Sequence, residues 1–159
     1  EYSSDAIKGT DIVFTTTNGT KAMLACVQAD TLLLAAFSNL SAITSSTAQE
    51  STLNIICSGT NGEITLEDVL LAGAIVHSRT EQPLASVNDQ ATLALNVWKE
   101  IIASDVPATI LFDKMKESRG GRNLLEVDKM ADIQFAANID TTSIIPTLNP
   151  TSLIITAAS

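Results

Sequence analysis

Short apolar and β-branched runs alternate along this chain with longer stretches that have the periodicity of helices. The runs predict β-strands over residues 11–15, 31–36, 53–57 and 152–156. The second run is almost entirely apolar, which is typical of a strand covered on both faces in a parallel sheet. Strands that alternate with helices predict an α/β fold, with a mostly parallel sheet and helices on both faces.

Apolar positions three and four residues apart predict the helices. They are expected over residues 20–28, 40–50, 65–79, 87–103 and 129–137, with one more that begins after Asp105 and has Pro107 in its first turn. We expect Asp128 to cap the last helix, and Asp68 to complete a capping box at the start of the third. One stripe of the fourth helix carries Ala91, Leu95, Trp98 and Ile102. Residues 86–137 are mostly helical, so a helical layer is expected in the C-terminal half of a single α/β domain over residues 1–159.

The charge balance excludes several classes of function. Nine basic residues against eighteen acidic ones give a net charge of −9. A broad surface for nucleic acid or for an anionic membrane is therefore not expected, because phosphate backbones need many cations. The single histidine excludes any site with two histidine ligands from this chain. No signal peptide is visible, so a cytoplasmic location is expected.

A Thr-Asn-Gly sequence occurs twice, at residues 17–19 and 60–62, each time between a predicted strand and a predicted helix. The helix that follows residues 17–19 would direct free backbone N–H groups and partial positive charge at an anion. A phosphate, carboxylate or sulfonate could then be held with the help of side-chain donors from Thr15, Thr16, Thr17, Asn18 and Thr20, with Lys21 as a cation. The same residues also suit an ordinary turn, because Asn-Gly tolerates positive φ.

The second Thr-Asn-Gly sequence is followed by three carboxylates, Glu63, Glu67 and Asp68. Three carboxylates near one helix N-terminus could bind Mg²⁺, a hard cation that prefers oxygen ligands and keeps several waters. The alternative is that all three carboxylates cap the helix or interact favourably with its dipole. Their spacing alone favours the second interpretation.

Five of the nine cations lie between residues 114 and 129. Within this stretch, residues 117–123 read as a mobile, glycine-containing loop that carries Arg119 and Arg122. Guanidinium groups bind phosphate and carboxylate in a bidentate manner, so this loop could clamp a substrate. The alternative is a solvated loop whose charge is balanced by the nearby acids Asp113, Glu117 and Glu126.

Motifs for a protein nucleophile are not satisfied. Cys57 is followed six residues later by Glu63, where a cysteine-phosphatase loop needs arginine, and Gly-x-Ser-x-Gly is absent around Ser58. A pair of Cys57 with His77 is conceivable, but a single histidine on an apolar helix is more often structural. Cys57 and Cys26 lie in apolar sequence surroundings, so both are expected to be buried, reduced thiols.

Several blocks together resemble the 2-phosphosulfolactate phosphatase family. They are residues 15–20, residues 62–68 with Ala72-Gly73, residues 121–124, and residues 131–133 ahead of Asp140 and Pro146. The resemblance implies a Mg²⁺-dependent phosphatase that converts 2-phosphosulfolactate to sulfolactate and phosphate, on a route to coenzyme M. It leaves open whether the reaction uses water at the metal or a covalent intermediate.

The resemblance also implies roles for particular residues. The expected catalytic residues are Asn18, Glu67 and Asp68, and the expected metal ligands are Glu63, Glu67 and Asp68. The substrate would be bound by Thr16, Thr17, Asn18, Gly19, Thr20, Lys21, Arg119, Gly121 and Arg122.

Family members are longer, and we expect this chain to lack an N-terminal segment that carries a further motif. The alternative function is then a catalytically incomplete domain that binds anions or another subunit. Apolar surface left uncovered would favour association, so a homo-oligomer is expected.

Overall fold

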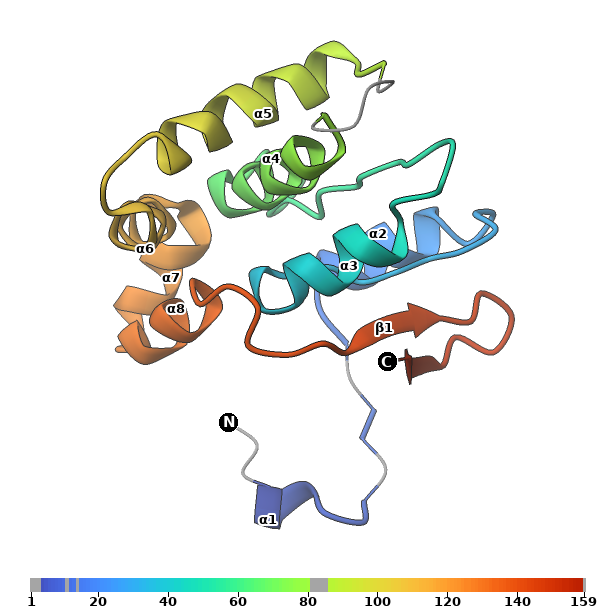
Figure 1. Cartoon of the computed structure of the whole chain (residues 1–159). Helices are drawn as coiled ribbons and strands as arrows, with labels where there is room; N and C mark the ends of the chain where they lie inside the picture. The colour runs from blue at the N-terminus through green and yellow to red at the C-terminus, as the bar shows by residue number, and fades with distance from the viewer. Residues whose placement is uncertain (1–3, 11, 14, 81–85, 159) are drawn as a thin grey trace.

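The computed structural model describes residues 4–10, 12, 13, 15–80 and 86–158 of the 159-residue chain (Figure 1). Helices α4–α8 gather in one half of the molecule, and α2, α3 and β1 lie in the other. The elements are α1 (Ser4–Ile7), α2 (Gly19–Ala25), the 3₁₀ helix η1 (Phe37–Asn39), α3 (Leu40–Ser46), α4 (Leu66–Thr80), α5 (Asp89–Ile102), α6 (Pro107–Glu117), α7 (Arg119–Glu126), α8 (Met130–Ala136), β1 (Ile145–Leu148) and β2 (Ile155–Ala158).

The mixed helix and strand content agrees with the predicted α/β class, but the strand pairing is antiparallel. β1 pairs with β2 from Ile145 opposite Ala158 to Leu148 opposite Ile155. Residues 32–34 lie along the other edge of β1, where Leu34 N–H donates to the Pro146 carbonyl over 2.9 Å. The prediction of a mostly parallel sheet was wrong, because every strand pair and bridge found among the described residues is antiparallel.

The sequence pattern did not indicate β1, because Pro146 lies inside it. Proline removes an N–H donor from a strand and normally argues against a central position. Here the Pro146 carbonyl still accepts a hydrogen bond from the neighbouring segment, so the strand forms despite the missing donor. The apolar run at 31–36 is also less covered than its pattern predicted: residues 32–34 are half-buried, and Ala35 and Ala36 are exposed.

The long helices agree closely with their predicted ranges, although several caps differ. Asn88 caps α5 by accepting a hydrogen bond from Ala91 N–H over 2.8 Å. Pro107 is the first residue of α6, as predicted, but Val106 occupies the cap position expected for Asp105. At the start of α8 the cap position belongs to Lys129 rather than to Asp128.

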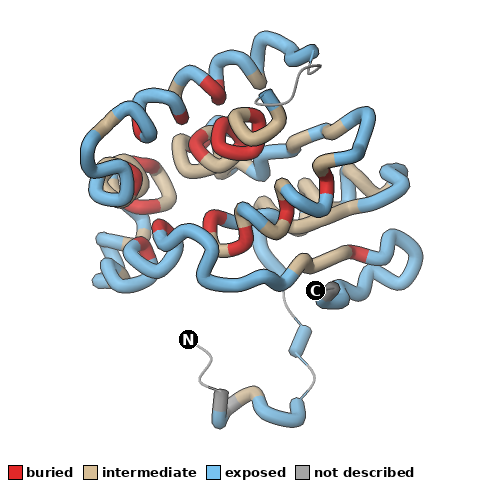
Figure 2. Tube along the Cα trace, in the orientation of Figure 1, coloured by how far each residue is buried: buried red, intermediate tan, exposed pale blue. Residues whose placement is uncertain are grey.

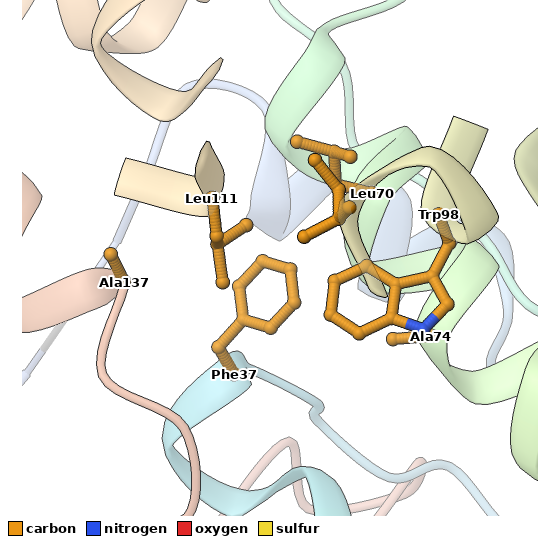
Figure 3. Packing of buried hydrophobic residues seen from close by; sticks show 7 residues of the cluster. Phe37, Leu70, Ala74, Trp98, Leu111 and Ala137 are labelled. Atoms are coloured by element: carbon orange, nitrogen blue, oxygen red, sulfur yellow. The ribbon is translucent and has the colours of Figure 1, made fainter. Parts of the chain in front are cut away.

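The core lies between the helices and η1 (Figure 2). α4 and α5 approach closely at Gly73, where an added Cβ would come 2.2 Å from the Ala94 carbonyl oxygen. The α5 stripe is rotated slightly from the predicted one, because Ile101 is buried and Ile102 is exposed. Figure 3 shows the Phe37 ring between Leu111 and Trp98, and the two aromatic ring centroids are 5.8 Å apart. The buried cluster consists of Phe37, Leu70, Ala74, Trp98, Ile101, Leu111 and Ala137.

The prediction of a mobile loop over residues 117–123 was wrong, because these residues form the junction between α6 and α7. The chain turns at Ser118 from α6 directly into α7, and the Ser118 hydroxyl accepts from Gly121 N–H over 2.9 Å. Ser118 and Gly121 are both buried. The two arginines are therefore fixed on a helix, and Arg119 is its first residue.

Candidate active site

The second Thr-Asn-Gly sequence forms a tight hairpin turn. Thr60 and Glu63 exchange backbone hydrogen bonds of 3.0 and 3.1 Å, and Asn61 and Gly62 between them have φ angles of 56° and 80°. Two central residues with positive φ are characteristic of a type I′ turn, for which Asn-Gly is strongly preferred. Gly59 precedes the turn with φ of 63°, and a Cβ there would lie 2.5 Å from the Glu63 carbonyl oxygen. We call residues 59–63 the hairpin turn.

The hairpin turn links three parts of the predicted site. Gly59 N–H donates to Asp68 Oδ2 over 2.7 Å, which ties the turn to the first turn of α4. Asn61 N–H donates to Asn18 Oδ1 over 3.1 Å, which ties it to the first Thr-Asn-Gly sequence. The Glu63 side chain forms an ion pair with Arg119 at the start of α7. Residues from α4, α7 and the segment before α2 therefore meet at this turn.

The first Thr-Asn-Gly sequence has a different conformation, which we call the threonine turn (residues 16–20). Thr16 N–H donates to Thr20 Oγ1 over 3.0 Å, and Thr20 N–H donates to Thr16 Oγ1 over 3.1 Å. This reciprocal pair occupies groups of Thr16 and Thr20 that we had expected to bind an anion. Asn18 has helical angles and Gly19 is already the first residue of α2. Thr17 and Lys21 are exposed, and no hydrogen bond or ion pair is found for their side chains among the described residues.

The three carboxylates predicted as metal ligands do not converge on one point. Glu63 is paired with Arg119, and Asp68 accepts from Gly59 N–H rather than completing the predicted capping box. Glu67 differs from both, because its Oε2 is buried without a hydrogen-bond partner in the described part of the chain. Groups of three or more acidic, histidine or cysteine side chains suited to a metal are also absent from that part.

The basic segment is largely neutralised by its own neighbours. Lys116 lies 2.9 Å from Asp113 and Lys114 lies 3.5 Å from Glu117, each one helical turn apart. Arg122 is exposed and donates to the Glu117 carbonyl. Of the two predicted arginines, only Arg119 contacts the hairpin turn.

The cysteines correct the prediction of two buried thiols, because Cys57 is exposed and Cys26 is half-buried. Partial desolvation of the Cys57 thiol, and secondly the negative charge of Asp68, raise its pKa above the ordinary value. Nucleophilic cysteines need the opposite shift, toward the thiolate. The direction of the Cys57 pKa shift therefore does not prepare this thiol for nucleophilic attack.

Four contact residues were not predicted as site residues from the sequence. Ser58, Gly59 and Asn61 bind Asp68 or Asn18 through hydroxyl or backbone groups, and Gly120 lies against Glu67. The repeated Thr-Asn-Gly sequence was the signal that could have nominated Asn61. Backbone donors such as Gly59 N–H have no signature of their own in a sequence.

These observations define a mixed α/β protein in which polar turns, carboxylates and an arginine meet at the ends of helices. The family described as 2-phosphosulpholactate phosphatase matches residues 1–151. The chain belongs to this family, as its sequence blocks predicted.

Curated relatives named "probable 2-phosphosulfolactate phosphatase" agree with this assignment. The protein from Pseudothermotoga lettingae is 34% identical over 140 residues, which cover 88% of this chain and 58% of the relative. Those from Symbiobacterium thermophilum and Thermotoga maritima are 32% and 31% identical, over 92% and 93% of this chain and 61% of each relative. The chain thus spans about 60% of the length of these relatives.

Proposed function

We propose that the protein to which this chain belongs is a Mg²⁺-dependent phosphatase. Its substrate would be the phosphate monoester of a small 2-hydroxy acid, and the names of the relatives favour 2-phosphosulfolactate, giving sulfolactate and phosphate. The observation that carries the proposal is the 3.1 Å hydrogen bond from Asn61 N–H to Asn18 Oδ1. It joins two turns far apart in the sequence into one polar surface beside α4. A route to coenzyme M and a cytoplasmic location remain predictions.

The threonine turn is proposed to bind the anionic groups of the substrate. The exposed Thr17 and Lys21, with the amide of Asn18, are the side chains there that do not serve the turn itself. Thr16, Gly19 and Thr20 would then hold the shape of the binding surface, because their polar or close contacts lie within the turn. Arg122 is exposed and one helical turn from Arg119, so it remains our candidate for the substrate carboxylate or sulfonate. Gly121, which is buried, would contribute by fixing α7.

The residues at the start of α4 fit a divalent cation in part. Glu67 offers a buried oxygen with no partner among the described residues, which is the kind of group a cation would satisfy. Asp68 is adjacent, and its Oδ1 has no hydrogen bond to the described residues. Glu63 is a weaker candidate, because its carboxylate pairs with Arg119. When bound, Mg²⁺ would neutralise charge on the phosphoryl oxygens.

The experiment is a measurement of phosphate release from 2-phosphosulfolactate and 2-phospholactate, with and without a chelator. It would use this chain and, in parallel, the longer Thermotoga maritima relative. We expect release by the longer protein to stop with chelator and to return with added Mg²⁺. Chelator-insensitive release would contradict the metal role, and release of phosphate from neither substrate would contradict the substrate class.

The alternative is a catalytically incomplete domain that binds anions or another subunit. Large apolar side chains that are exposed to solvent support it. Val13, Ile56 and Ile64 are all more than half exposed, at 99%, 59% and 86%. We therefore expect the chain to form homo-oligomers, as predicted. Sedimentation of a clean monomer at micromolar concentration would argue against this expectation.

A further inference from the structure

The first two residues of α7 contact two of the carboxylates around the start of α4. Arg119 pairs with Glu63, and Gly120 lies directly against Glu67. A Cβ at Gly120 would come 2.3 Å from Glu67 Oε1 and 3.2 Å from its Cδ. The Glu67 carboxylate therefore occupies the space that any side chain at position 120 would need.

The conformation of the backbone does not explain this glycine. Gly120 is not among the glycines with positive φ, and it lies in the first turn of a helix, where glycine is a poor helix former. The close approach of the Glu67 carboxylate therefore explains why position 120 has no side chain. The same carboxylate has its other oxygen buried and without a partner among the described residues.

We infer that Gly120 is a positioning residue for Glu67. The missing side chain allows α7 to pack on the carboxylate, which holds Oε1 in place and leaves Oε2 for a divalent cation. This inference rests on the proposed function, in which Glu67 is a ligand of the divalent cation. The contact itself is a property of the chain and can be tested without a metal.

The adjacent glycine provides a matched control. A Cβ at Gly121 would come 2.0 Å from the Met115 carbonyl oxygen, which is backbone of α6 and cannot rotate away. At Gly120 the obstacle is the end of a flexible side chain. Gly120→Ala should therefore move Glu67 and leave the fold intact, whereas Gly121→Ala should damage the junction between α6 and α7.

The test measures Mg²⁺ affinity by calorimetry and the midpoint of urea unfolding for this chain. We expect Gly120→Ala to weaken Mg²⁺ binding by about tenfold or more, as removal of supporting residues does at other metal sites. Its unfolding midpoint without Mg²⁺ should stay close to that of the parent, and Gly121→Ala should lower the midpoint strongly. In a Glu67→Ala background, Gly120→Ala should change the affinity no further. Additive losses of affinity would overturn the inference.

A second pair of variants separates positioning from general damage. Glu67→Asp shortens the side chain by one methylene, which removes the clash with a Cβ at position 120. Gly120→Ala combined with Glu67→Asp should then bind Mg²⁺ more tightly than Gly120→Ala alone. A merely structural role for Gly120 predicts no such rescue.

A measurement without metal distinguishes this inference from the proposed function. Glu67→Ala should shift the backbone amide NMR signals of residues 119–121, because the carboxylate lies against them. If wild-type protein binds no Mg²⁺ but these amides shift, the metal role fails and the positioning contact is retained. If the amides do not move, Gly120 does not position Glu67, whatever the metal does.

Discussion

The hairpin turn and the threonine turn share the sequence Thr-Asn-Gly but have different conformations. Asn61 and Gly62 both have positive φ, whereas Asn18 has φ of −104° and Gly19 begins α2. The residues that follow account for the difference. Lys21, Ala22 and Met23 continue a helix directly, but α4 begins only at Leu66. A three-residue match therefore indicates a turn without specifying which one.

The two turns also differ in what stabilises them. The threonine turn is closed by its own hydroxyl groups, through the pair between Thr16 and Thr20. The hairpin turn relies on glycine conformation and on the Asp68 carboxylate from α4. We therefore expect substitutions in the hairpin turn to have larger and more distant effects than those in the threonine turn.

The largest expected effect is the loss of Gly59. Alanine there must adopt φ of 63° and place its Cβ 2.5 Å from the Glu63 carbonyl oxygen. Because left-handed backbone alone costs an L-residue about 1–2 kcal/mol, Gly59→Ala should lower the free energy of unfolding by about 2–3 kcal/mol. Gly19 needs no positive φ, and a Cβ there meets only the Thr16 hydroxyl. Gly19→Ala should change stability by less than about 1 kcal/mol.

Urea unfolding monitored by circular dichroism measures both values. Gly62→Ala is the control for strain without a clash, since Gly62 has φ of 80° and open space around it. Its cost should be about 1–2 kcal/mol, between the other two. Equal effects of Gly59→Ala and Gly19→Ala would show that the two turns are equivalent after all.

The sequence predicted the helices far better than it predicted these contacts. α4 was expected over 65–79 and α5 over 87–103, because apolar periodicity is a local signal. Strand partners depend on distant segments, so the pairing of residues 32–34 with β1 was not predictable. Contacts within the candidate site also depend on residues that are distant in the sequence. Residue types nominated Glu63 and Arg119, but their pairing across 56 residues required the fold.

Removal of the Asp68 carboxylate should have the next largest effect. Asp68 is half-buried, and its 2.7 Å bond from Gly59 N–H is charge-assisted. Allowing for partial solvent screening, Asp68→Ala should cost about 1.5–2 kcal/mol, and Asp68→Asn less, because an amide oxygen can still accept. Faster hydrogen exchange at the Gly59 amide would locate the effect in the hairpin turn. Unchanged exchange there in both variants would contradict the role of Asp68 as its anchor.

The connection between the two turns should contribute less. Asn18 Oδ1 accepts a neutral hydrogen bond of 3.1 Å from Asn61 N–H, so Asn18→Ala should cost about 0.5–1.5 kcal/mol. The matched control is Thr17→Ala, because Thr17 is exposed and has no hydrogen bond to the described residues. Urea unfolding gives both values. If the turns fold as one unit, Asn18→Ala will also speed exchange at the Asn61 amide, and Thr17→Ala will not.

The smallest expected effect is on the titration of Cys57, beside the hairpin turn. Partial desolvation and the Asp68 charge raise its pKa, so Asp68→Asn should lower the pKa part of the way back. Because the folded thiol holds its proton more tightly than the unfolded one, its contribution to stability is complete below about pH 8.5, where an unfolded thiol ionises. The contribution disappears as the pH rises through the folded pKa. Alkylation of Cys57 by iodoacetamide against pH, in a Cys26→Ser background, measures the shift. An identical profile for Asp68→Asn would mean that the carboxylate acts on the turn through Gly59 alone and not on the thiol.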